Sequence, residues 1–441
     1  MSLLLSGGMV ASSLDPPRVA PADVAVEGGR IAPVPAPGAA RIDCAGCLVV
    51  PGNACGHTHL YSALARGMPF ALEPPATFLQ ILQRVWWRLD RALDEESIRA
   101  SALLGAMEAL LAGTTSLVDH HASPNAVDGS LDVLAGALEE VGIRSVLCYE
   151  VTDRDGGERA RAGVAENDRF LASLAARPRP LVRGMVGAHA SFTLSEDTLA
   201  ACVDVARRHD TGLHVHVAED GADERDARAR FGTTVAARLA RAGALDDRAL
   251  LAHCVHLDGD EIALVRDSAA AVAHNPRSNM HNGVGRAPVA ALGPRVVLGT
   301  DGIGADMFEE SRAGYFRLRE DDLGAPAGWP LEWLGETQRM VGRGYAEPLL
   351  GRLEPGAPAD LVVLDYDPPT PIAAENLAGH WTFGLSAGAV RDVIVGGEVV
   401  VRDRRPVRVD GAKVAAEAHA AAERLWARLE RIDPHPFAPE D

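Results

Sequence analysis

The chain has 441 residues, which is too long for one ordinary domain and suits a large α/β domain with a smaller module beside it. Hydrophobic residues make up 47% of the sequence, enough for a large buried core. The formal net charge of -18 predicts an acidic surface that repels phosphate backbones and anionic membranes, so neither nucleic acid nor membrane is an expected partner.

The first ten residues, MSLLLSGGMV, carry no basic region and only a short apolar run, so we do not expect a signal peptide. No stretch of the sequence approaches the length of a membrane span. The six cysteines are scattered through apolar surroundings, and the CxxC formed by Cys44 and Cys47 has no second pair to complete a metal site. Buried thiols of this kind are typical of a reducing compartment, and we expect a cytoplasmic protein.

Short alternating segments at both ends of the chain predict a small β-module. Residues 1–50 alternate apolar and polar positions between Gly and Pro turns, and residues 351–410 return to the same pattern. The last stretch, 411–441, opens with an amphipathic helical pattern. We therefore expect a β-sandwich module built from both chain ends and followed by a C-terminal helix.

The central part of the chain, residues 51–350, alternates apolar runs with Ala- and Leu-rich helical stretches. Near-continuous apolar runs predict parallel strands that are buried on both faces, and eight of them predict a (β/α)8 barrel. A doubly wound open sheet is the alternative, but no GxGxxG or GxxxxGK[ST] motif follows any run. The runs span residues 47–59, 114–121, 144–151, 182–192, 211–220, 249–257, 270–280 and 295–302.

Histidines gather where these predicted strands end. In a (β/α)8 barrel the carboxyl ends of the strands form one rim, and active sites are built there. A single histidine at a strand end is usually a packed core residue, but so many on one rim favour a functional site. Eleven of the 15 histidines are near strand ends: His57, His59, His120, His121, His189, His214, His216, His253, His256, His274 and His281.

Side chains alternate along a strand, so residues two apart share a face. His57 and His59 are therefore expected to point into the barrel together, as are His214 and His216, with His214 the deeper of that pair and a packing residue. Asp301 follows the run RVVLGT and reaches the same rim. The set His57, His59, His216 and Asp301 offers mixed nitrogen and oxygen ligands that suit one divalent ion, Zn²⁺ first and Fe²⁺ as the alternative. An ion held by so few protein ligands leaves room for water and activates it.

Two further residues are candidates for catalysis. Glu219 lies three residues after His216, in position to move protons at a substrate, and the alternative is a solvated carboxylate in the acidic pair with Asp220. His253, on the next predicted strand, is either a further metal ligand or a partner of the attacking water.

At these residues the sequence resembles the amidohydrolase superfamily. The resemblance rests on HTH after PG, HVHVAE, AHCVH, HNPRSNM and GTDG at successive strands, and on GRLEPGAPADLVVLD at the return into the β-module. Within the superfamily the chain looks like the branch of aminohydrolases and chlorohydrolases that includes S-adenosylhomocysteine, guanine and 8-oxoguanine deaminases and triazine hydrolases. It is most similar there to SsnA-type aminohydrolases, through PGNACGHTHLYSALARGMP, VWWRLDRALDEES and GTDGIGADMFEE.

The resemblance implies a role for each candidate. The metal ligands would be His57, His59, His216 and Asp301. Glu219 would be the proton shuttle, His253 would orient the attacking water, and Asp301 would also act as general base. His189 would contact the substrate, and Asp90, in WRLD, falls near a substrate-binding carboxylate of some relatives.

The number of metal ions is limited by the lysine content. Two-metal members of the superfamily commonly bridge their ions with a carboxylated lysine on the fourth strand, but the only lysine here, Lys413, lies in the C-terminal helix. A lysine-bridged pair is excluded, while a pair bridged by Glu150 or Cys148 stays open.

These features predict a metal-dependent hydrolytic deaminase that releases ammonia from a small polar N-heterocycle, such as an oxidised purine, a pterin or a triazine-like ring. The alternatives are a cyclic amidohydrolase or a hydrolytic dechlorinase with the same mononuclear site, and a non-catalytic relative that binds a ligand. A homodimer is expected only by analogy with the superfamily.

The substrate is expected to meet side chains along the rim. Only one of the neighbouring His120 and His121 can point inward, and we select His121 because it is nearer the rim. The donors available suggest an oxygen-rich or anionic ligand. The predicted substrate-binding residues are His189, His121, Arg66, Asp90 and Asn279.

Overall fold

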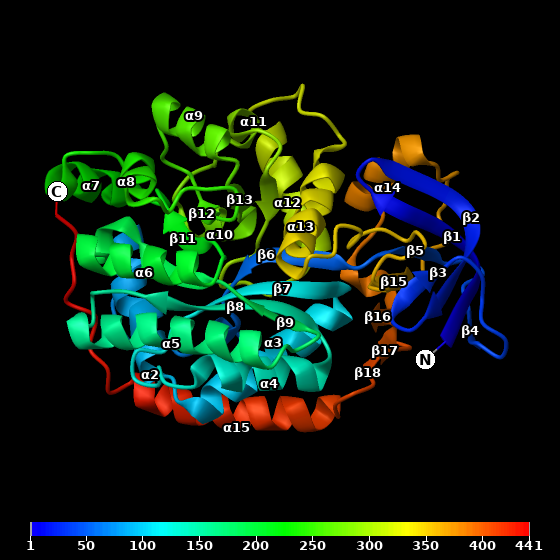
Figure 1. Cartoon of the computed structure of the whole chain (residues 1–441), viewed down its shortest axis with the longest axis horizontal. Helices are drawn as coiled ribbons and strands as arrows, with labels where there is room; N and C mark the ends of the chain where they lie inside the picture. Colours follow the sequence, from blue (N-terminus) through cyan, green and yellow to red (C-terminus); the bar gives the residue numbers. More distant parts are fainter. Residues whose placement is uncertain (1, 441) are drawn as a thin grey trace.

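The computed structural model describes residues 2–440, and two sheets organise them (Figure 1). The first is a nearly closed parallel barrel, in the order β14-β13-β12-β11-β10-β8-β7-β6, with β9 (Val182–Gly184) added beside β8. The predicted (β/α)8 barrel is therefore confirmed, and the open doubly wound sheet is wrong. Its strands are β6 (Asn53–Thr58), β7 (Thr114–His121), β8 (Arg144–Val151), β10 (Val186–Ala190), β11 (Leu213–Val217), β12 (Leu250–His253), β13 (Ala271–His274) and β14 (Val296–Leu298).

The barrel strands form because apolar runs are buried on both faces. Every residue of β7, β8, β10 and β11 is buried, with barrel interior on one side and helices on the other. The ring closes between β6 and the end of β14, where the carbonyl of His57 accepts the backbone N–H groups of Thr300 and Asp301. The covering helices include α3 (Glu95–Leu111), α4 (Ser130–Val141), α5 (Gly157–Ala176), α6 (Glu196–Arg208), α8 (Val235–Ala242), α9 (Gly259–Ser268), α12 (Met307–Arg319) and α13 (Trp329–Tyr345).

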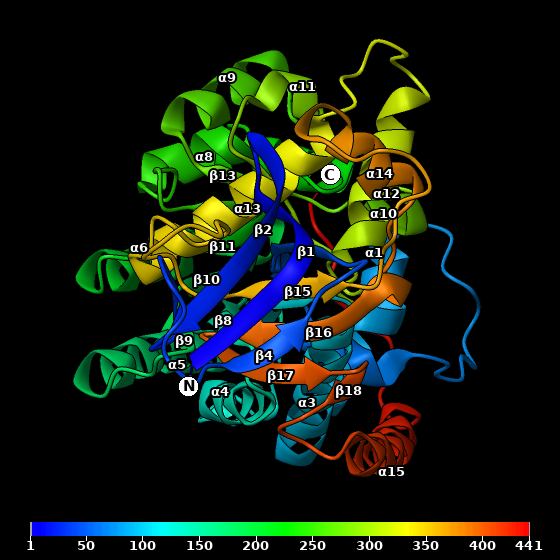
Figure 2. The same cartoon turned by 90° about the vertical axis from the view of Figure 1, so that its right-hand side faces the viewer.

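The second sheet comes from both chain ends, as predicted, and lies beside the barrel (Figure 2). Most neighbouring strands in it are antiparallel, while β1 pairs in parallel with β4 and β5. The division of the chain near residues 50 and 350 stays a prediction. The strands are β1 (Ser2–Leu14), β2 (Pro17–Glu27), β3 (Arg30–Ala32), β4 (Ala40–Asp43), β5 (Leu48–Pro51), β15 (Leu361–Leu364), β16 (Val390–Val395), β17 (Glu398–Arg402) and β18 (Arg405–Pro406).

One predicted strand is in fact two. The run 47–59 divides at Gly52 into β5, which belongs to the β-module, and β6, which opens the barrel. A Cβ atom on Gly52 would lie 2.2 Å from the Thr115 hydroxyl, so only glycine lets the chain pass this close to β7 as it changes sheets. The apolar pattern continues through the change because both halves are buried.

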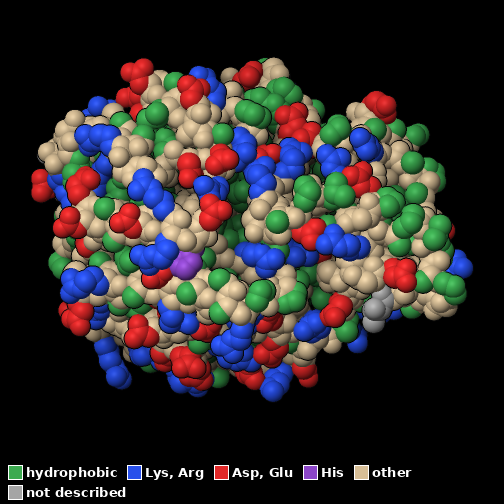
Figure 3. Space-filling view, viewed as in Figure 1, with side chains coloured by type: hydrophobic (Ala, Val, Ile, Leu, Met, Phe, Trp, Pro, Cys, Tyr) green, Lys and Arg blue, Asp and Glu red, His purple; other side chains and the backbone are tan. Residues whose placement is uncertain are grey.

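The predicted C-terminal helix is α15 (Gly411–Leu429), which packs on α3 and carries Lys413 away from the barrel mouth. On the face shown in Figure 3, acidic and basic side chains are interspersed. Among residues 2–440, no helix is both long and apolar enough to cross a bilayer.

A buried ion pair joins the two sheets. Arg144 on β8 makes paired hydrogen bonds of 2.8 and 3.0 Å to the carboxylate of Asp360, next to β15. Asp360 also accepts the backbone N–H of Gly396 at 2.7 Å, and both side chains are at most 7% exposed.

Replacing Arg144 by Leu should leave the Asp360 carboxylate buried without its cation and lower the free energy of unfolding by about 3–5 kcal/mol. Urea unfolding measures this. R144L/D360N, which removes the charge and keeps an acceptor for Gly396, should recover part of the loss. R424L, which breaks an exposed pair with Glu96, should cost about 1 kcal/mol or less. If R144L and R424L lowered the free energy of unfolding by similar amounts, the pair of Arg144 and Asp360 would not stabilise the fold as a buried ion pair.

Candidate metal and catalytic site

Four potential metal ligands meet at the barrel rim. His57 and His59 come from the end of β6, His216 from β11, and Asp301 from the residues after β14. The Nε2 atom of His59 lies 3.1 Å from Asp301 Oδ1 and 3.3 Å from His216 Nε2. The Nε2 atom of His57 lies 3.6 Å from the same Oδ1. All four ligand atoms lie within 4.8 Å of one another, as a single ion requires.

The hydrogen bonds of these histidines leave the Nε2 atoms free to bind an ion. His59 and His216 each use Nδ1 to donate to a backbone carbonyl, at 2.6 and 2.8 Å, so each Nε2 keeps its lone pair. His57 Nε2 is buried without a hydrogen-bond partner, and burial lowers the pKa of His57 to about 3. Three imidazole nitrogens and one carboxylate aimed at one point fit a divalent ion such as Zn²⁺.

His57 is held by a histidine beneath it. Its Nδ1 shares a 2.9 Å hydrogen bond with His214 Nε2, and His214 Nδ1 lies 3.6 Å from Cys148 Sγ. His214 is therefore deeper in the barrel than His216, as the strand alternation predicts. A ligand histidine whose second nitrogen is fixed in this way keeps its ring orientation.

A second group of possible ligands shares atoms with the first. His120 and Glu150 lie near His59 and His216, and ligand atoms of these four also fall within 4.8 Å. An imidazole Nε2 has one lone pair, so His59 and His216 cannot serve two ions with the same nitrogen. These two groups can therefore hold one ion between them, and His57 and Asp301 complete a site for it. A third group, His120, Cys148 and His214, lies deeper, where His214 Nε2 is engaged with His57.

The candidate acid and base occupy the other side of the cluster. His253 Nε2 lies 3.5 Å from Glu219 Oε2, and Glu219, His253 and Asp301 form a compact group. Burial and the negative charge of Asp301 hold the pKa of Glu219 well above its ordinary value. Despite its own burial, the imidazoles of His57 and His59 that face its carboxylate hold the pKa of Asp301 well below its ordinary value. Glu219 is thus set to donate a proton while Asp301 stays ionised.

Backbone strain marks the same residues. His253 has φ of 73° and Asp301 has φ of 55°, both in the left-handed region that non-glycine residues seldom adopt. Such conformations cost free energy and persist where the surrounding structure holds them, which is common at active sites.

Helix α10 (Pro276–Asn282) supports all three catalytic candidates from one end of the barrel. Ser278 donates to Asp301 Oδ2, Asn279 Oδ1 accepts from His253 Nδ1 at 2.8 Å, and Asn282 Nδ2 lies 3.5 Å from Glu219 Oε1. Asn279, predicted to bind substrate, therefore orients His253 instead. Sequence reasoning missed Ser278 and Asn282, although their four-residue spacing in HNPRSNMHN places them on one helix face.

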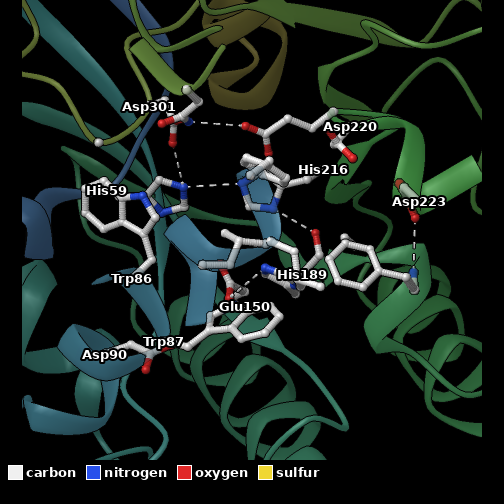
Figure 4. Close-up of a pocket in the computed structure, with 18 of the residues that line it drawn as sticks. His59, Trp86, Trp87, Asp90, Glu150, His189, His216, Asp220, Asp223 and Asp301 are labelled. Carbon is white, nitrogen blue, oxygen red and sulfur yellow. Dashed lines mark hydrogen bonds and ion pairs between the residues drawn. The ribbon is translucent and has the colours of Figure 1, made fainter. Parts of the chain in front are cut away.

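A pocket opens over the metal cluster (Figure 4). His59, His216, Glu219 and Asp301 line one side, and the predicted His189 lies between them and an aromatic wall. The remaining lining includes Trp86, Trp87, Asp90, Glu150, Phe192, Asp220, Asp223 and Asn282.

The lining is acidic. No described lining residue is Lys or Arg, and burial raises the pKa of Asp90 to about 7 even with Arg154 beside it. The lining itself therefore supplies no fixed cation for an anionic ligand, and the expectation of an oxygen-rich or anionic ligand stays a prediction. Its carboxylates belong to Asp90, Glu150, Glu219, Asp220, Asp223 and Asp301.

Two predicted substrate contacts lie elsewhere. His120, rather than His121, faces the barrel interior, with its ring centroid 4.8 Å from that of His216. His121 points to the opposite face of β7, where its Nε2 shares a 2.9 Å hydrogen bond with Ser123. Arg66 is exposed and paired with Glu108 at 2.7 Å, outside this pocket. The prediction that His121 points inward is wrong, because its side chain faces away from the barrel. Arg66 lines an adjoining pocket that also contacts His59 and Trp86, and its substrate contact stays a prediction.

A model of the amidohydrolase family matches residues 48–335, which are most of the chain. The chain belongs to this family. The family assignment made from the rim motifs is confirmed, and with it an enzyme of the hydrolase class that acts on carbon–nitrogen bonds other than peptide bonds.

Curated amidohydrolases cover most of the same length. A protein of Pelotomaculum thermopropionicum named 5-methylthioadenosine/S-adenosylhomocysteine deaminase is 32% identical over 87% of each chain. A protein of Methanosarcina acetivorans named 5'-deoxyadenosine deaminase is 31% identical over 88% of each chain.

Solved amidohydrolase structures have the same fold. A zinc-bound adenosine deaminase from Xanthomonas campestris superposes with a TM-score of 0.81 at 24% identity, over 96% of this chain and 98% of that one. Atrazine chlorohydrolase from Arthrobacter aurescens, complexed with zinc, gives 0.78 at 26% identity, over 95% and 100%. Together with the His/Asp cluster, these zinc-bound neighbours support a divalent metal site.

Replacing His214 by Phe should weaken metal binding by about 10–100-fold, because His57 loses the partner that fixes its ring. Competition with a chromophoric zinc chelator measures the change. H419Q, at an exposed helix position, is the matched control and should bind like the parent. Unchanged affinity in H214F would mean that His57 is not a ligand or does not depend on His214.

Proposed function

We propose that this amidohydrolase is a mononuclear metal-dependent deaminase that removes the amino group from an N-heterocycle and releases ammonia. The observation that carries the proposal is geometric: Glu219 and Asp301 line one pocket, their ligand atoms and that of His253 lie within 4.8 Å of one another, and Asp301 also belongs to the metal cluster. The opposite directions of their pKa shifts agree with one acid and one base. An acid and a base at the same carbon are what hydrolytic deamination needs.

His57, His59, His216 and Asp301 would hold the ion, which supplies a Lewis acid that makes water nucleophilic near neutral pH. Asp301 accepts a proton from the attacking water, and His253, oriented by Asn279, aims that water at the ring carbon. Glu219 protonates the neighbouring ring nitrogen, takes a proton back from the hydroxyl group added to the ring carbon, and passes it to the amino group, which leaves as ammonia. The proton that Asp301 took from water then returns to Glu219, so both carboxyl groups recover their starting states.

The substrate class follows from the lining and from the relatives. Trp86, Trp87 and Phe192 offer faces for a flat ring, and the surrounding carboxylates favour a neutral, donor-rich ligand. Relatives of similar length are named as deaminases of adenosine-type nucleosides, so aminopurine nucleosides are our first choice. Oxidised purines, pterins and triazine-like rings are the next amino-heterocycles to test. Zn²⁺ is the proposed ion, with Fe²⁺ as alternative, and a cytoplasmic homodimer is the proposed setting.

A second candidate keeps the metal and changes the leaving group. The 26% identity to an atrazine chlorohydrolase over 95% of the chain supports hydrolytic dechlorination, and a cyclic amide would use the same residues. A screen of amino-, chloro- and cyclic amide heterocycles with metal-loaded protein separates them, because only deamination releases ammonia and only dechlorination releases chloride.

Replacing Glu219 by Gln should lower kcat for ammonia release by about 10²–10⁴-fold while the metal content stays the same, because Gln cannot transfer the proton. Ammonia is measured with a coupled assay and the metal by elemental analysis. E375Q, at an exposed acidic residue, should match the parent. If E219Q kept full turnover, Glu219 would not be the proton shuttle.

A further inference from the structure

A segment after the last helix reaches back to the active-site end of the barrel. Residues 433–440, called here the strap, leave α15 and run along the barrel to α7 (Gly221–Phe231), which follows Glu219 in the chain (Figure 1). The strap is attached by backbone hydrogen bonds. His435 N donates to the carbonyl of Gln83 at 3.0 Å, Gln83 Nε2 donates to the carbonyl of Phe437 at 2.7 Å, and Glu440 N donates to Asp226 at 2.8 Å.

The strap and the end of α15 hold the helix that carries part of the pocket. Helix α2 (Trp87–Ala92) supplies Trp87 and Asp90 to the lining. Arg88 donates to the carbonyls of Leu429 and Ile432, at 2.8 and 2.6 Å, and Arg91 donates to the carbonyl of Asp433 at 2.7 Å. Helix α2 is thus fixed between the strap and the pocket.

Two strap side chains stand directly behind the aromatic wall. The ring centroid of Phe437 lies 5.9 Å from that of Trp87 and 6.3 Å from that of Phe192. The ring centroid of His435 lies 5.3 Å from that of Trp87. Trp87 and Phe192 both line the pocket, so the strap forms the outer layer of this wall.

His435 also begins a buried chain of charges that ends at the pocket. Its Nε2 lies 3.5 Å from the carboxylate of Asp155, whose other oxygen lies 3.5 Å from Arg154 Nε. Arg154 pairs with Asp90 and, at 3.1 Å, with Glu150. His435, Asp155 and Arg154 are nearly inaccessible to solvent, so these contacts are not screened by water.

Two polar atoms of the wall supported in this way have no partner within the protein. Trp87 Nε1 and Asp90 Oδ1 are both buried and have no hydrogen-bond partner. Both residues line the pocket, and burying a donor and an acceptor without partners costs free energy, so the position of this wall has to be held by other contacts.

We propose that the strap determines which ring substituents the enzyme accepts. Phe437 and His435 are positioning residues: Phe437 fixes Trp87 and Phe192, and His435 fixes Arg154 and thereby Asp90. A firmly held wall selects a compact polar substituent and excludes a bulky one. The selectivity part of this inference rests on the proposed deaminase function, whereas the support of Trp87 by the strap does not.

Phe437→Ala should raise KM for the best aminopurine nucleoside by about tenfold with little change in kcat, because the wall is displaced while Glu219 and the metal cluster are not. The ratio of kcat/KM for 5'-methylthioadenosine to kcat/KM for 5'-deoxyadenosine should also rise, because a displaced wall tolerates the larger 5' group of 5'-methylthioadenosine. His435→Ala should raise KM in the same way. F437L should restore most of the parent KM, and A438S, at an exposed strap position, should match the parent. Unchanged KM and selectivity in F437A, with only thermal stability reduced, would overturn the proposal.

A second readout needs no substrate. The fluorescence of Trp87 is obtained by subtracting the signal of the W87F counterpart from that of each variant. Its quenching by acrylamide should increase in F437A and stay the same in A438S. The far-UV circular dichroism spectrum should stay unchanged in both. Quenching that does not change in F437A would overturn the role of the strap. If the parent released no ammonia from any amino-heterocycle, the proposed function would fail, and the quenching experiment would still decide whether the strap supports the wall.

Discussion

The closure of the barrel between its first and last strands is the constraint on which the site depends. The carbonyl of His57 accepts the backbone N–H groups of Thr300 and Asp301, and these bonds fix Asp301 beside His57 although the two are far apart in the sequence. Asp301 is forced into a left-handed backbone conformation there, and its carboxylate comes within 3.1 Å of His59. The energy of the complete hydrogen-bonded ring maintains this local strain, so the ligand set exists only in the closed barrel.

Burial then gives identical functional groups different roles. Asp301 and Glu219 both lose solvation, but the Asp301 carboxylate faces the imidazoles of both His57 and His59, and its negative charge in turn disfavours ionisation of Glu219. The pKa values of the two carboxyl groups therefore move in opposite directions because of one shared neighbourhood. Asn279 and Asn282, on α10, fix the positions of His253 and Glu219 without adding charge.

The sequence was most informative at the ends of the barrel strands, where an apolar run is followed by histidine or aspartate on several strands. Spacing predicted the eight strands, the shared face of His57 and His59, and the deeper position of His214. It did not determine which of His120 and His121 faces inward, because every residue of β7 is buried and alternation leaves no polar–apolar signal. The split at Gly52 was hidden for the same reason. The pairing of Arg66 was not predicted because a loop arginine gives no sign of its partner, Glu108, which lies on a different element.

The strap was beyond sequence reasoning for a different physical reason. DPHPFAPE has no period and no regular secondary structure, and its contacts join residues more than 200 positions apart, such as His435 with Gln83 and Glu440 with Asp226. Two features of its composition nevertheless suit the strap to its position along the barrel. Proline at 434, 436 and 439 restricts the backbone of the free segment, which lowers the entropy lost when it docks. The residues between the prolines, His435 and Phe437, are the ones that contact Trp87. A segment pre-ordered in this way can fix a pocket wall with few contacts, which is why the far end of the chain can influence a site built at the rim of the barrel.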